Sequence, residues 1–594
     1  MISPPSLMDD VDAVQAQIAR NMMDSGDWVT ARLDGIAYLE KSPLKYWLIA
    51  ISFKVFGVHD WAARIPVSLA AVVLCWLTFR IATWAFSVRA GLCAGLVLAT
   101  SIGLFLFTRI QIPDVTIAAT IALSMWSFLR ALDPDERRPG VWSAVMAAAI
   151  GTGLLLKGLI AAVFPVAAAL LYLAFTRQIT SRQAWKRLRP FRGLVIALAI
   201  AAPWHVLATL RNPPYFNLTL HSGPGEYRGF FWFYFINEHV LRFLNLRYPR
   251  DYNTVPRLYF WLFHLLWLFP WSVYFPAVAK LSFRPADRAG RMRLLCLCWA
   301  GFLLTFFTFS STQEYYSMPC YPALALLIGC ALADDKAQAW IRYGRAALAL
   351  VAGLAGLAIA VILSQVWSLP APGDISRALT QHPEAYTLSL GHMGDLTLAS
   401  FAYLRAPLIM AGLAFLIGAF AAWRGRMAGV VLMMILFFHA ARLAMVAFDP
   451  YLGSRPLAEA LNRSPRGTLI LDDQYYTFSS VVFYAEAYHG RRVLLLNGRV
   501  NNLEYGSYAP DAPQDVFLDD SQFREHWLSP DLFYICVEKP RVERLEKLVG
   551  KSELHVVAES GGKYVFANHG TQSVAGSIVS EDARAVLRFA GLRQ

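Results

Sequence analysis

Apolar stretches long enough to cross a bilayer follow one another through most of this chain. A membrane-spanning helix needs about 20 predominantly apolar residues to cross a hydrocarbon core of about 30 Å. Stretches near that length predict about twelve spans, at residues 64–85, 90–108, 113–131, 141–156, 158–175, 192–210, 257–279, 292–309, 317–333, 345–364, 402–421 and 427–447. The pattern therefore predicts a polytopic α-helical membrane protein.

The polar joints between these spans fall into two alternating sets. One set is rich in Arg and Lys, as between Arg177 and Arg192, and the positive-inside rule places it in the cytoplasm. The other set holds the loops 211–256 and 365–401 and everything after residue 448, which we expect outside the cytoplasm. Residues 1–63 fall on the same outer side without a signal peptide to carry them there. We expect that a first transmembrane helix is missing from the chain ahead of this segment.

The pattern changes after residue 448. Strands are predicted at 468–472, 492–496, 533–537, 554–558 and 564–567, around helical stretches at 476–488 and 541–549, which indicates a small α/β domain. The predicted division is a juxtamembrane segment 1–63, a multi-span domain 64–447, a periplasmic α/β domain 448–570 and a loosely held tail 571–594.

Composition supports the membrane assignment and narrows the function classes. Apolar residues make up 57% of the 594 residues and charged residues 16%, whereas soluble domains average about 25% charged. A net charge of +13 would favour nucleic acid in a soluble chain, but here the basic residues gather between spans, so no nucleic-acid role is expected. The seven cysteines indicate neither a disulfide framework nor a cysteine-rich metal site.

The first outer segment opens with three carboxylates, Asp9, Asp10 and Asp12, immediately before an amphipathic stretch. In a helix the apolar residues of this stretch share one face, which favours a segment lying flat on the membrane. An interface helix with a capping Asp explains the stretch about as well as a functional site does.

Three further outer segments carry more polar groups than a connecting loop needs. Asp114 begins an apolar span, where it is either a helix cap or a functional carboxylate at membrane depth. In the loop 211–256, His239 and Arg242 are three residues apart, so a helix would let them bind one anion together. A run at 310–319 contains Tyr316, which an aromatic belt explains about as well as a site does.

All four segments face one compartment. Cations there suit the phosphate of a lipid, and a carboxylate there suits a base that acts on a hydroxyl or amine acceptor. The shared side favours a single composite site over four separate structural features.

Five motifs resemble membrane glycosyltransferases of the C superfamily, in the aminoarabinose-transferase branch that is related to protein O-mannosyltransferases. They are Ile-Ala-Arg-Asn-Met at 18–22, Ser-Gly-Asp-Trp-Val at 25–29, Tyr-Leu-Glu-Lys-Ser-Pro-Leu-Lys-Tyr-Trp at 38–47, Glu-His-Val-Leu-Arg-Phe at 238–243 and Tyr-Ser-Met-Pro at 316–319. The resemblance implies one helix more than the spans counted above and an enzyme of a Gram-negative inner membrane. That enzyme would transfer a sugar, with inversion, from a polyprenyl phosphate to an acceptor on the periplasmic face.

The resemblance also implies roles for individual residues. The catalytic base is expected among Asp9, Asp10 and Asp12, with the pair Asp9-Asp10 preferred, and Asp114 matches a second family carboxylate. The expected phosphate-binding residues are Lys41, Arg242 and Tyr316, and the pair expected beside a divalent cation is Glu40 and His239. Two such ligands are acceptable to a metal but do not establish one.

The sugar and the acceptor stay open at this point, and the acceptor is a lipid, a glycan or a protein. Thr312-Gln313-Glu314 stands where the aminoarabinose enzymes tend to carry Lys, which argues against assuming the same sugar. Two rival functions are a lipid-linked sugar flippase or transporter and a non-catalytic membrane scaffold. A transporter predicts charges inside the spans and an internal repeat, whereas the polar groups here collect on one side.

Overall fold

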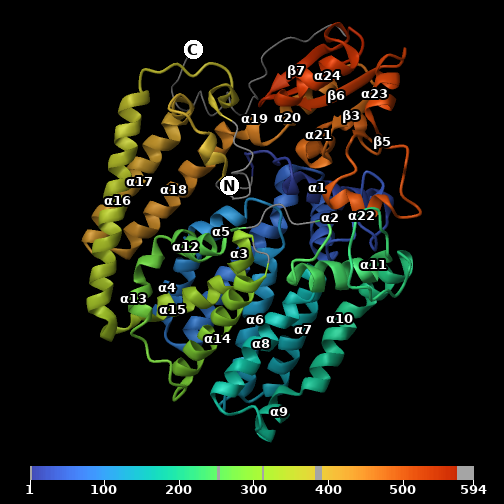
Figure 1. Cartoon of the computed structure of the whole chain (residues 1–594). Coiled ribbons are helices and arrows are strands. Elements are labelled where there is room, and N and C mark those ends of the chain that lie inside the picture. Colours follow the sequence, from blue (N-terminus) through green and yellow to red (C-terminus); the bar gives the residue numbers. More distant parts are fainter. Residues whose placement is uncertain (1–2, 250–254, 311–312, 381–390, 571–594) are drawn as a thin grey trace.

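The computed structural model describes residues 3–249, 255–310, 313–380 and 391–570, so the predicted tail 571–594 lies outside the described residues. Long helices form a bundle, and a smaller layer that contains the strands covers one end of it (Figure 1). The bundle helices are α3 (Asp60–Ala85), α4 (Val88–Ala99), α5 (Ile102–Phe107), α6 (Asp114–Leu132), α7 (Pro139–Lys157), α8 (Ile160–Phe175), α9 (Arg182–Leu188), α10 (Pro190–Arg211), α12 (Arg257–Trp267), α13 (Phe275–Val278), α14 (Arg288–Phe309), α15 (Tyr321–Ala333), α16 (Gln338–Val366), α17 (Arg405–Trp423) and α18 (Met427–Ala447).

Each of the twelve predicted spans is helical over most of its length. Within the described ranges, nine helical stretches are long and apolar enough to cross a membrane. The other three predicted spans differ in shape: 90–108 is divided into α4 and α5, α8 has only 16 residues, and α12 meets the next helical stretch at a bend of 95°. The helical membrane architecture is thus confirmed.

The two interrupted spans contact each other at their breaks. The Trp271 indole N–H donates to the Thr100 hydroxyl at 2.9 Å, and the Ile102 amide donates to the Phe269 carbonyl at 3.3 Å. A helix break leaves backbone groups without intrahelical partners, and in an apolar setting such groups must find partners elsewhere. Each break therefore supplies hydrogen bonds that the other requires.

The N-terminal segment comprises α1 (Val11–Ser25), a hairpin of β1 (Arg32–Leu33) and β2 (Ile36–Ala37), and α2 (Leu44–Phe56). The expected amphipathic helix forms, but its apolar residues Val14, Ile18 and Met22 are buried inside the protein. They belong to a core shared with α2 and with helix α21 (Ser479–Tyr484) of the C-terminal region. The expectation of a helix lying flat on the membrane is therefore wrong, because protein covers the apolar face.

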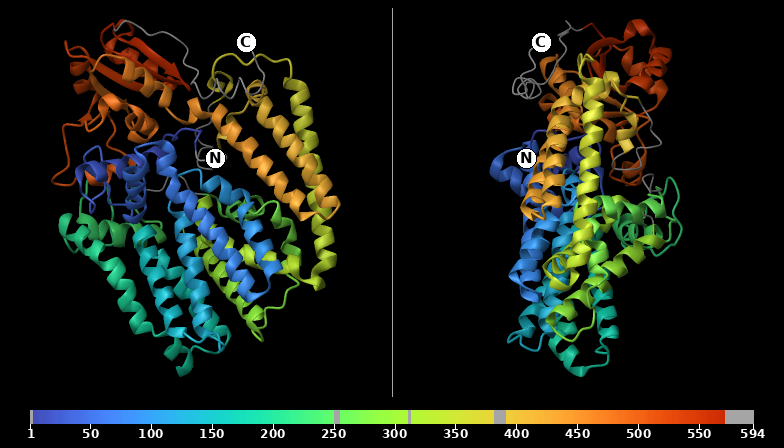
Figure 2. Two further views of the ribbon diagram at one scale, coloured as in Figure 1. Left: turned by 180° about the vertical axis from the view of Figure 1, so that it is seen from behind. Right: turned by 90° about the vertical axis from the view of Figure 1, so that its left-hand side faces the viewer.

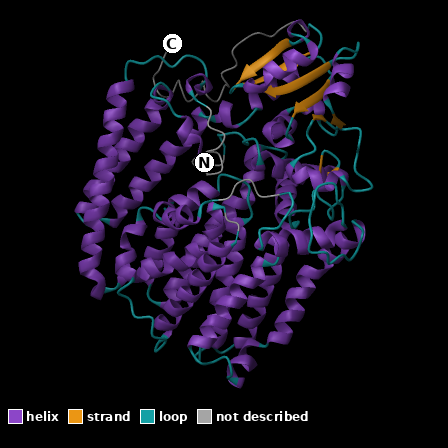
Figure 3. Cartoon of the chain, in the orientation of Figure 1, coloured by secondary structure: helices purple, strands orange, loops and turns teal. Residues whose placement is uncertain are grey.

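The C-terminal region contains a six-stranded sheet in the order β5-β4-β3-β6-β8-β7. Its central strands pair in parallel, and β7 and β8 add an antiparallel edge. The strands are β3 (Thr468–Asp472), β4 (Leu494–Leu496), β5 (Phe517–Leu518), β6 (Phe533–Glu538), β7 (His555–Ser560) and β8 (Lys563–Ala567), and the helices are α19 (Asp449–Leu452), α20 (Arg455–Arg463), α21 (Ser479–Tyr484), α22 (Asn501–Ser507), α23 (Asp520–Trp527) and α24 (Val542–Val549). The five predicted strands are all present, and all described strands except the β1–β2 hairpin lie in this region (Figure 3).

The two faces of this sheet have different partners. Helices α23 and α24 pack on one face through residues such as Trp527 and Leu545. The other face packs on α20, α21 and the N-terminal α1, so that Leu469 and Ile18 belong to one core. Seen from behind, the N-terminal elements lie directly beneath the sheet layer (Figure 2). The described N-terminal segment and the C-terminal region thus form one unit at this end of the bundle.

Candidate active site

The three N-terminal aspartates occupy different environments. Asp9 accepts hydrogen bonds from the Ser480 amide and hydroxyl, both at 2.8 Å, and forms an ion pair with Lys563 at 2.6 Å. Asp12 is 1% exposed and forms an ion pair with Arg64 at 2.6 Å. These contacts join Asp9 to the C-terminal region and Asp12 to the bundle. Both carboxylates are therefore held by structural partners.

Asp10 differs from its two neighbours because the residue as a whole is exposed and its side chain makes no capping hydrogen bond to α1. The surrounding protein nevertheless crowds the carboxyl group, and desolvation, followed by the charge of Asp9, raises its pKa to about 7. Its backbone lies at φ 68° and ψ −140°, a conformation that costs a non-glycine residue about 1–3 kcal/mol. An accessible, strained carboxylate that titrates near neutral pH is a candidate general base.

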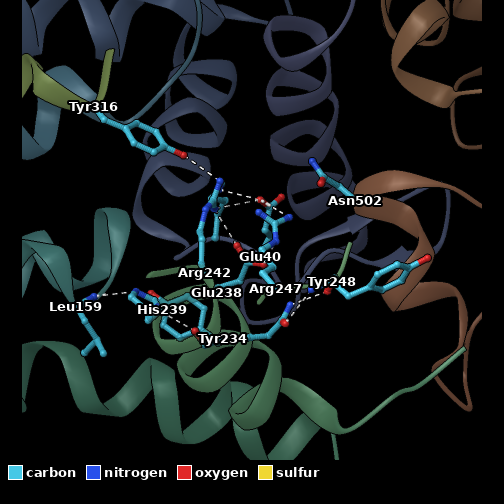
Figure 4. A network of polar contacts seen from close by, with 12 residues as sticks. Glu40, Leu159, Tyr234, Glu238, His239, Arg242, Arg247, Tyr248, Tyr316 and Asn502 are labelled. Atoms are coloured by element: carbon cyan, nitrogen blue, oxygen red, sulfur yellow. Dashed lines mark hydrogen bonds and ion pairs between the residues drawn. The ribbon is translucent and has the colours of Figure 1, made fainter. Parts of the chain in front are cut away.

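Glu40 lies at the centre of a cluster of cations (Figure 4). Its carboxylate is 2.9 Å from the Lys41 ammonium, 3.9 Å from the Arg247 guanidinium and 4.0 Å from the Arg242 guanidinium. Burial alone would raise the pKa of Glu40, but the cations hold it well below its usual range. The carboxylate therefore stays ionised and orients three positive groups that come from two distant segments.

A π-helix formed by Trp232–Leu241 sets the direction of the next residues. Its i→i+5 hydrogen bonding rotates successive residues less than an α-helix does, so residues three apart diverge and residues four apart approach one another. Glu238 accordingly pairs with Arg242, four residues further on, at 3.0 Å. It also pairs with Arg247 at 2.9 Å. The expectation that His239 and Arg242 share a face assumed an α-helix, and in the structure they bind different partners.

His239 is held by backbone groups at both ring nitrogens. Its Nδ1 hydrogen-bonds the Tyr234 carbonyl at 2.6 Å, and its Nε2 accepts from the Leu159 amide at 3.0 Å. Burial, with Arg242 and Lys41 adding to it, lowers the pKa of His239 to about 4, so the ring is neutral at pH 7. His239 thereby holds the π-helix against the turn between α7 and α8.

The expected cation pair, Glu40 and His239, does not fit a metal in this arrangement. Cations surround the Glu40 carboxylate, and the His239 lone pair is already used by an amide. In the described part of the chain, no group of three or more His, Cys, Asp or Glu residues has the spacing of a metal site. A metal would require both side chains to change partners, so a metal requirement stays a prediction.

Tyr316 connects this cluster to the bundle. The Arg242 guanidinium donates to the Tyr316 hydroxyl at 2.9 Å, and the Lys157 ammonium lies 4.7 Å from the centre of the Tyr316 ring. Lys157 is the last residue of α7, and it pairs with Asp114, the first residue of α6. Asp114 is 1% exposed. The structure thus brings Lys41, Arg242, Tyr316 and Asp114 into one neighbourhood.

Several residues of this neighbourhood were not predicted. The Tyr38 hydroxyl donates to Glu40 at 2.9 Å and also contacts the Tyr476 hydroxyl at 2.9 Å, which in turn accepts from Asn502 at 3.0 Å. The backbone carbonyl of Tyr476 accepts from the Asp10 amide at 2.8 Å. Tyr476 therefore connects the exposed aspartate to the cation cluster. Of the other unpredicted residues, Lys157 had a usable signal, because it lies directly between the predicted spans 141–156 and 158–175 and ionisable groups at membrane depth are functional candidates.

Sequence comparison agrees with this geometry. The profile of the family described as dolichyl-phosphate-mannose-protein mannosyltransferase matches residues 40–206, which include Glu40, Lys41, Asp114 and Lys157. An undecaprenyl phosphate-aminoarabinose arabinosyl transferase of Pseudomonas fluorescens is 26% identical over 393 residues, which are 64% of this chain and 61% of that protein. This chain is thus similar in sequence to that arabinosyl transferase. A transferase of the same name from Pseudomonas aeruginosa is 29% identical over 364 residues, 58% of each chain. The matches thus span about three-fifths of these relatives.

Solved structures extend this similarity over most of the chain. The crystal structure of ArnT from Cupriavidus metallidurans bound to undecaprenyl phosphate superposes with a TM-score of 0.74 at 22% sequence identity and covers 96% of both chains. The apo structure of the same protein gives a TM-score of 0.72 over 95% of both chains. At this identity the likeness establishes the fold. The protein is a multi-pass protein of the bacterial inner membrane with an ArnT-like architecture.

Proposed function

We propose that this protein is a glycosyltransferase that moves a sugar from undecaprenyl phosphate, or a similar polyprenyl phosphate, to an acceptor in the cell envelope. Two findings support this proposal: the names of the relatives, and the ArnT structure that was solved with undecaprenyl phosphate. The observation that carries it in this chain is the cation cluster around Glu40, which Tyr476 connects to the backbone amide of the exposed residue Asp10. A lipid phosphate suits the cluster, and an acceptor hydroxyl or amine suits the carboxylate.

Lys41 and Arg242 are the proposed phosphate-binding residues. Both groups are partly exposed, with side chains 25% and 17% accessible, although each contacts Glu40. They can therefore keep their carboxylate partner and still donate to an incoming phosphate. The Tyr316 hydroxyl lies beside Arg242 and is proposed to border the same phosphate. Arg247 is 7% exposed, so its proposed role is to hold Glu40 and Glu238 in place.

Asp10 is the proposed general base. Its carboxylate takes the proton from the acceptor hydroxyl or amine while that atom attacks the anomeric carbon of the sugar. The bond between this carbon and the phosphate oxygen breaks at the same time, and its electron pair stays on the phosphate. Lys41 and Arg242 stabilise the charge that develops there. Attack from the side opposite the leaving phosphate inverts the anomeric centre.

Asp114 and Lys157 are proposed to support the phosphate-binding groups. The Asp114 carboxylate holds Lys157 against the ring of Tyr316, and Tyr316 accepts from Arg242. Because Asp114 is almost completely buried, it is better suited to hold a cation than to contact a substrate. Asp114 is therefore proposed to act through Lys157.

The proposed topology places the cluster and the C-terminal α/β domain in the periplasm. The supporting pattern is the excess of Arg and Lys in the joints at the opposite ends of the helices, such as Arg182, Lys186 and Arg187 around α9. The proposed division into residues 1–63, 64–447 and 448–570 follows the same sidedness. The twelve helical segments are proposed to be the spans, with the short and bent ones included.

The test is transfer of labelled sugar from a polyprenyl phosphate donor in membranes that carry Asp10→Asn, Asp9→Asn or Asp12→Asn. Asp10→Asn should reduce transfer by about 10²–10⁴-fold while the protein stays folded, whereas the other two changes should lower the melting temperature and thereby reduce activity. Full activity in all three variants would show that the base is assigned wrongly. If the wild-type protein carries the donor across the bilayer but never consumes it, the protein is a transporter instead.

A further inference from the structure

Lys45 is a buried cation with no anionic partner. It lies in the first turn of α2 and is 7% exposed. Among the described residues, its ammonium has no carboxylate within ion-pair distance and no hydrogen-bond acceptor, and it lies 4.7 Å from the centre of the Tyr46 ring. A buried lysine without a partner is rare, because the charge loses its hydration and receives nothing in return.

The surroundings of Lys45 increase this cost. Its charged neighbours are Lys41 with Glu40 and Lys157 with Asp114. Each carboxylate already has its own cation, since Glu40 pairs with Lys41 and Asp114 pairs with Lys157. Lys45 is therefore a surplus positive charge between two ion pairs.

Two further effects work in the same direction. The N-terminus of a helix carries a partial positive charge, so a lysine in the first turn of α2 is placed unfavourably. Burial, and then the charge of Lys41, lowers the pKa of Lys45 well below its usual range. A residue selected for stability at this position would be apolar, and the surplus charge therefore indicates an anionic ligand.

The proposed reaction supplies such a ligand. In the donor, the phosphate is linked to both lipid and sugar and carries one negative charge. When the bond to the sugar breaks, the remaining lipid phosphate can carry a second charge. Lys41 and Arg242 share their charges with Glu40 and Glu238, so an additional cation would match the charge that appears on the leaving group.

We propose that Lys45 is a third cation of the phosphate site and donates a hydrogen bond to an oxyanion of the bound polyprenyl phosphate. This inference rests on the proposed function. It also implies that Lys45 binds the lipid phosphate product more strongly than the intact donor, because the product carries more charge. A carboxylate on the donor sugar would satisfy the same ammonium, and the experiment below separates the two sources.

The experiment compares Lys45→Met with Lys54→Met in the purified full-length protein. Lys54 is a matched control, because it is on the same helix, is exposed and lies over the ring of Trp28 at 4.9 Å. Binding of undecaprenyl phosphate is measured by titration, and folding is measured by thermal unfolding without ligand. Lys45→Met should weaken binding about tenfold or more, the equivalent of about 1.4 kcal/mol, while its melting temperature without ligand stays the same or rises. Lys54→Met should bind as the wild type does.

Three outcomes would count against this inference, and they differ in meaning. If the wild type does not bind undecaprenyl phosphate, the proposed function itself fails. If the wild type binds and both Lys45→Met and Lys45→Gln bind equally well, only the assignment of Lys45 fails. If both variants bind undecaprenyl phosphate normally but lose affinity only for a donor whose sugar carries a carboxylate, the oxyanion belongs to the sugar and the phosphate assignment is overturned.

Discussion

The pH dependence of transfer should reveal Asp10 directly. With a pKa of about 7, the carboxyl group is about one-tenth ionised at pH 6 and about nine-tenths ionised at pH 8. A base must be deprotonated to accept a proton, so kcat/KM should rise about tenfold between these two values and level off above pH 8. The parameter kcat/KM is the appropriate one, because it reports the pKa of the free enzyme.

Two variants separate Asp10 from other causes of a pH effect. Asp10→Asn should lower kcat/KM by about 10²–10⁴-fold and remove this rise. Asp9→Asn removes a charge that raises the pKa of Asp10 and leaves Lys563 without its anion, and both changes favour ionisation of Asp10. The rise should therefore move to lower pH in Asp9→Asn, in assays kept well below the melting temperature of that variant.

The matched control is Asp24→Asn, a change in an exposed carboxylate near the end of α1, the helix that follows Asp10. It should leave the midpoint of the pH profile near 7. The reasoning is refuted if Asp10→Asn keeps the wild-type profile, or if Asp9→Asn moves the midpoint to higher pH.

Three further changes test other parts of the structure. Arg64→Met leaves Asp12 buried without its ion pair, so the free energy of unfolding should fall by about 3–5 kcal/mol, which is measured as a lower melting temperature. Arg80 is an exposed residue of the same helix, and Arg80→Met should have little effect. Equal melting temperatures in the two variants would contradict the pairing. Tyr476→Phe removes the hydroxyl between Tyr38 and Asn502. It should reduce kcat several-fold, since one or two hydrogen bonds are lost and each is worth about 1 kcal/mol. An unchanged kcat would show that the C-terminal region does not position Glu40. Gly158 has a φ of +79°, and Gly158→Ala places a methyl group against His239 and Tyr234, so this change should reduce transfer strongly. Gly301 faces open space, and Gly301→Ala should leave transfer unchanged. Comparable activity in the two variants would argue against a role for the turn at Gly158.

The fold could be predicted from sequence to the extent that it depends on hydrophobic length and period. The twelve apolar stretches are helical, and the five predicted strands are present, because both follow from which residues must be buried. The bend of 95° after α12 and the break before Ile102 could not be predicted. Hydropathy reports how many apolar residues are adjacent, but it does not report the direction of the helix axis.

The candidate site was predictable where one motif carried several functional groups. Glu40 and Lys41 are adjacent, and Arg242 and Tyr316 belong to motifs of the same resemblance, and the structure brings all four together. The choice among Asp9, Asp10 and Asp12 could not be made from sequence, because it depends on Lys563, Ser480 and Arg64, which are distant along the chain. The prediction that His239 and Arg242 share one helix face was wrong, because the sequence does not distinguish a π-helix from an α-helix.

The central claim is that this protein consumes a polyprenyl-phosphate-linked sugar at the site formed by Asp10, Lys41 and Arg242. The most direct measurement is a product balance with the purified protein in liposomes, supplied with undecaprenyl phosphate that carries a labelled sugar and with Gram-negative envelope lipids as acceptors. We expect the wild type to release undecaprenyl phosphate and labelled acceptor in equal amounts, and Asp10→Asn to release neither. The claim is contradicted if the wild type leaves the donor intact, or if Asp10→Asn and Lys41→Met consume it at the wild-type rate.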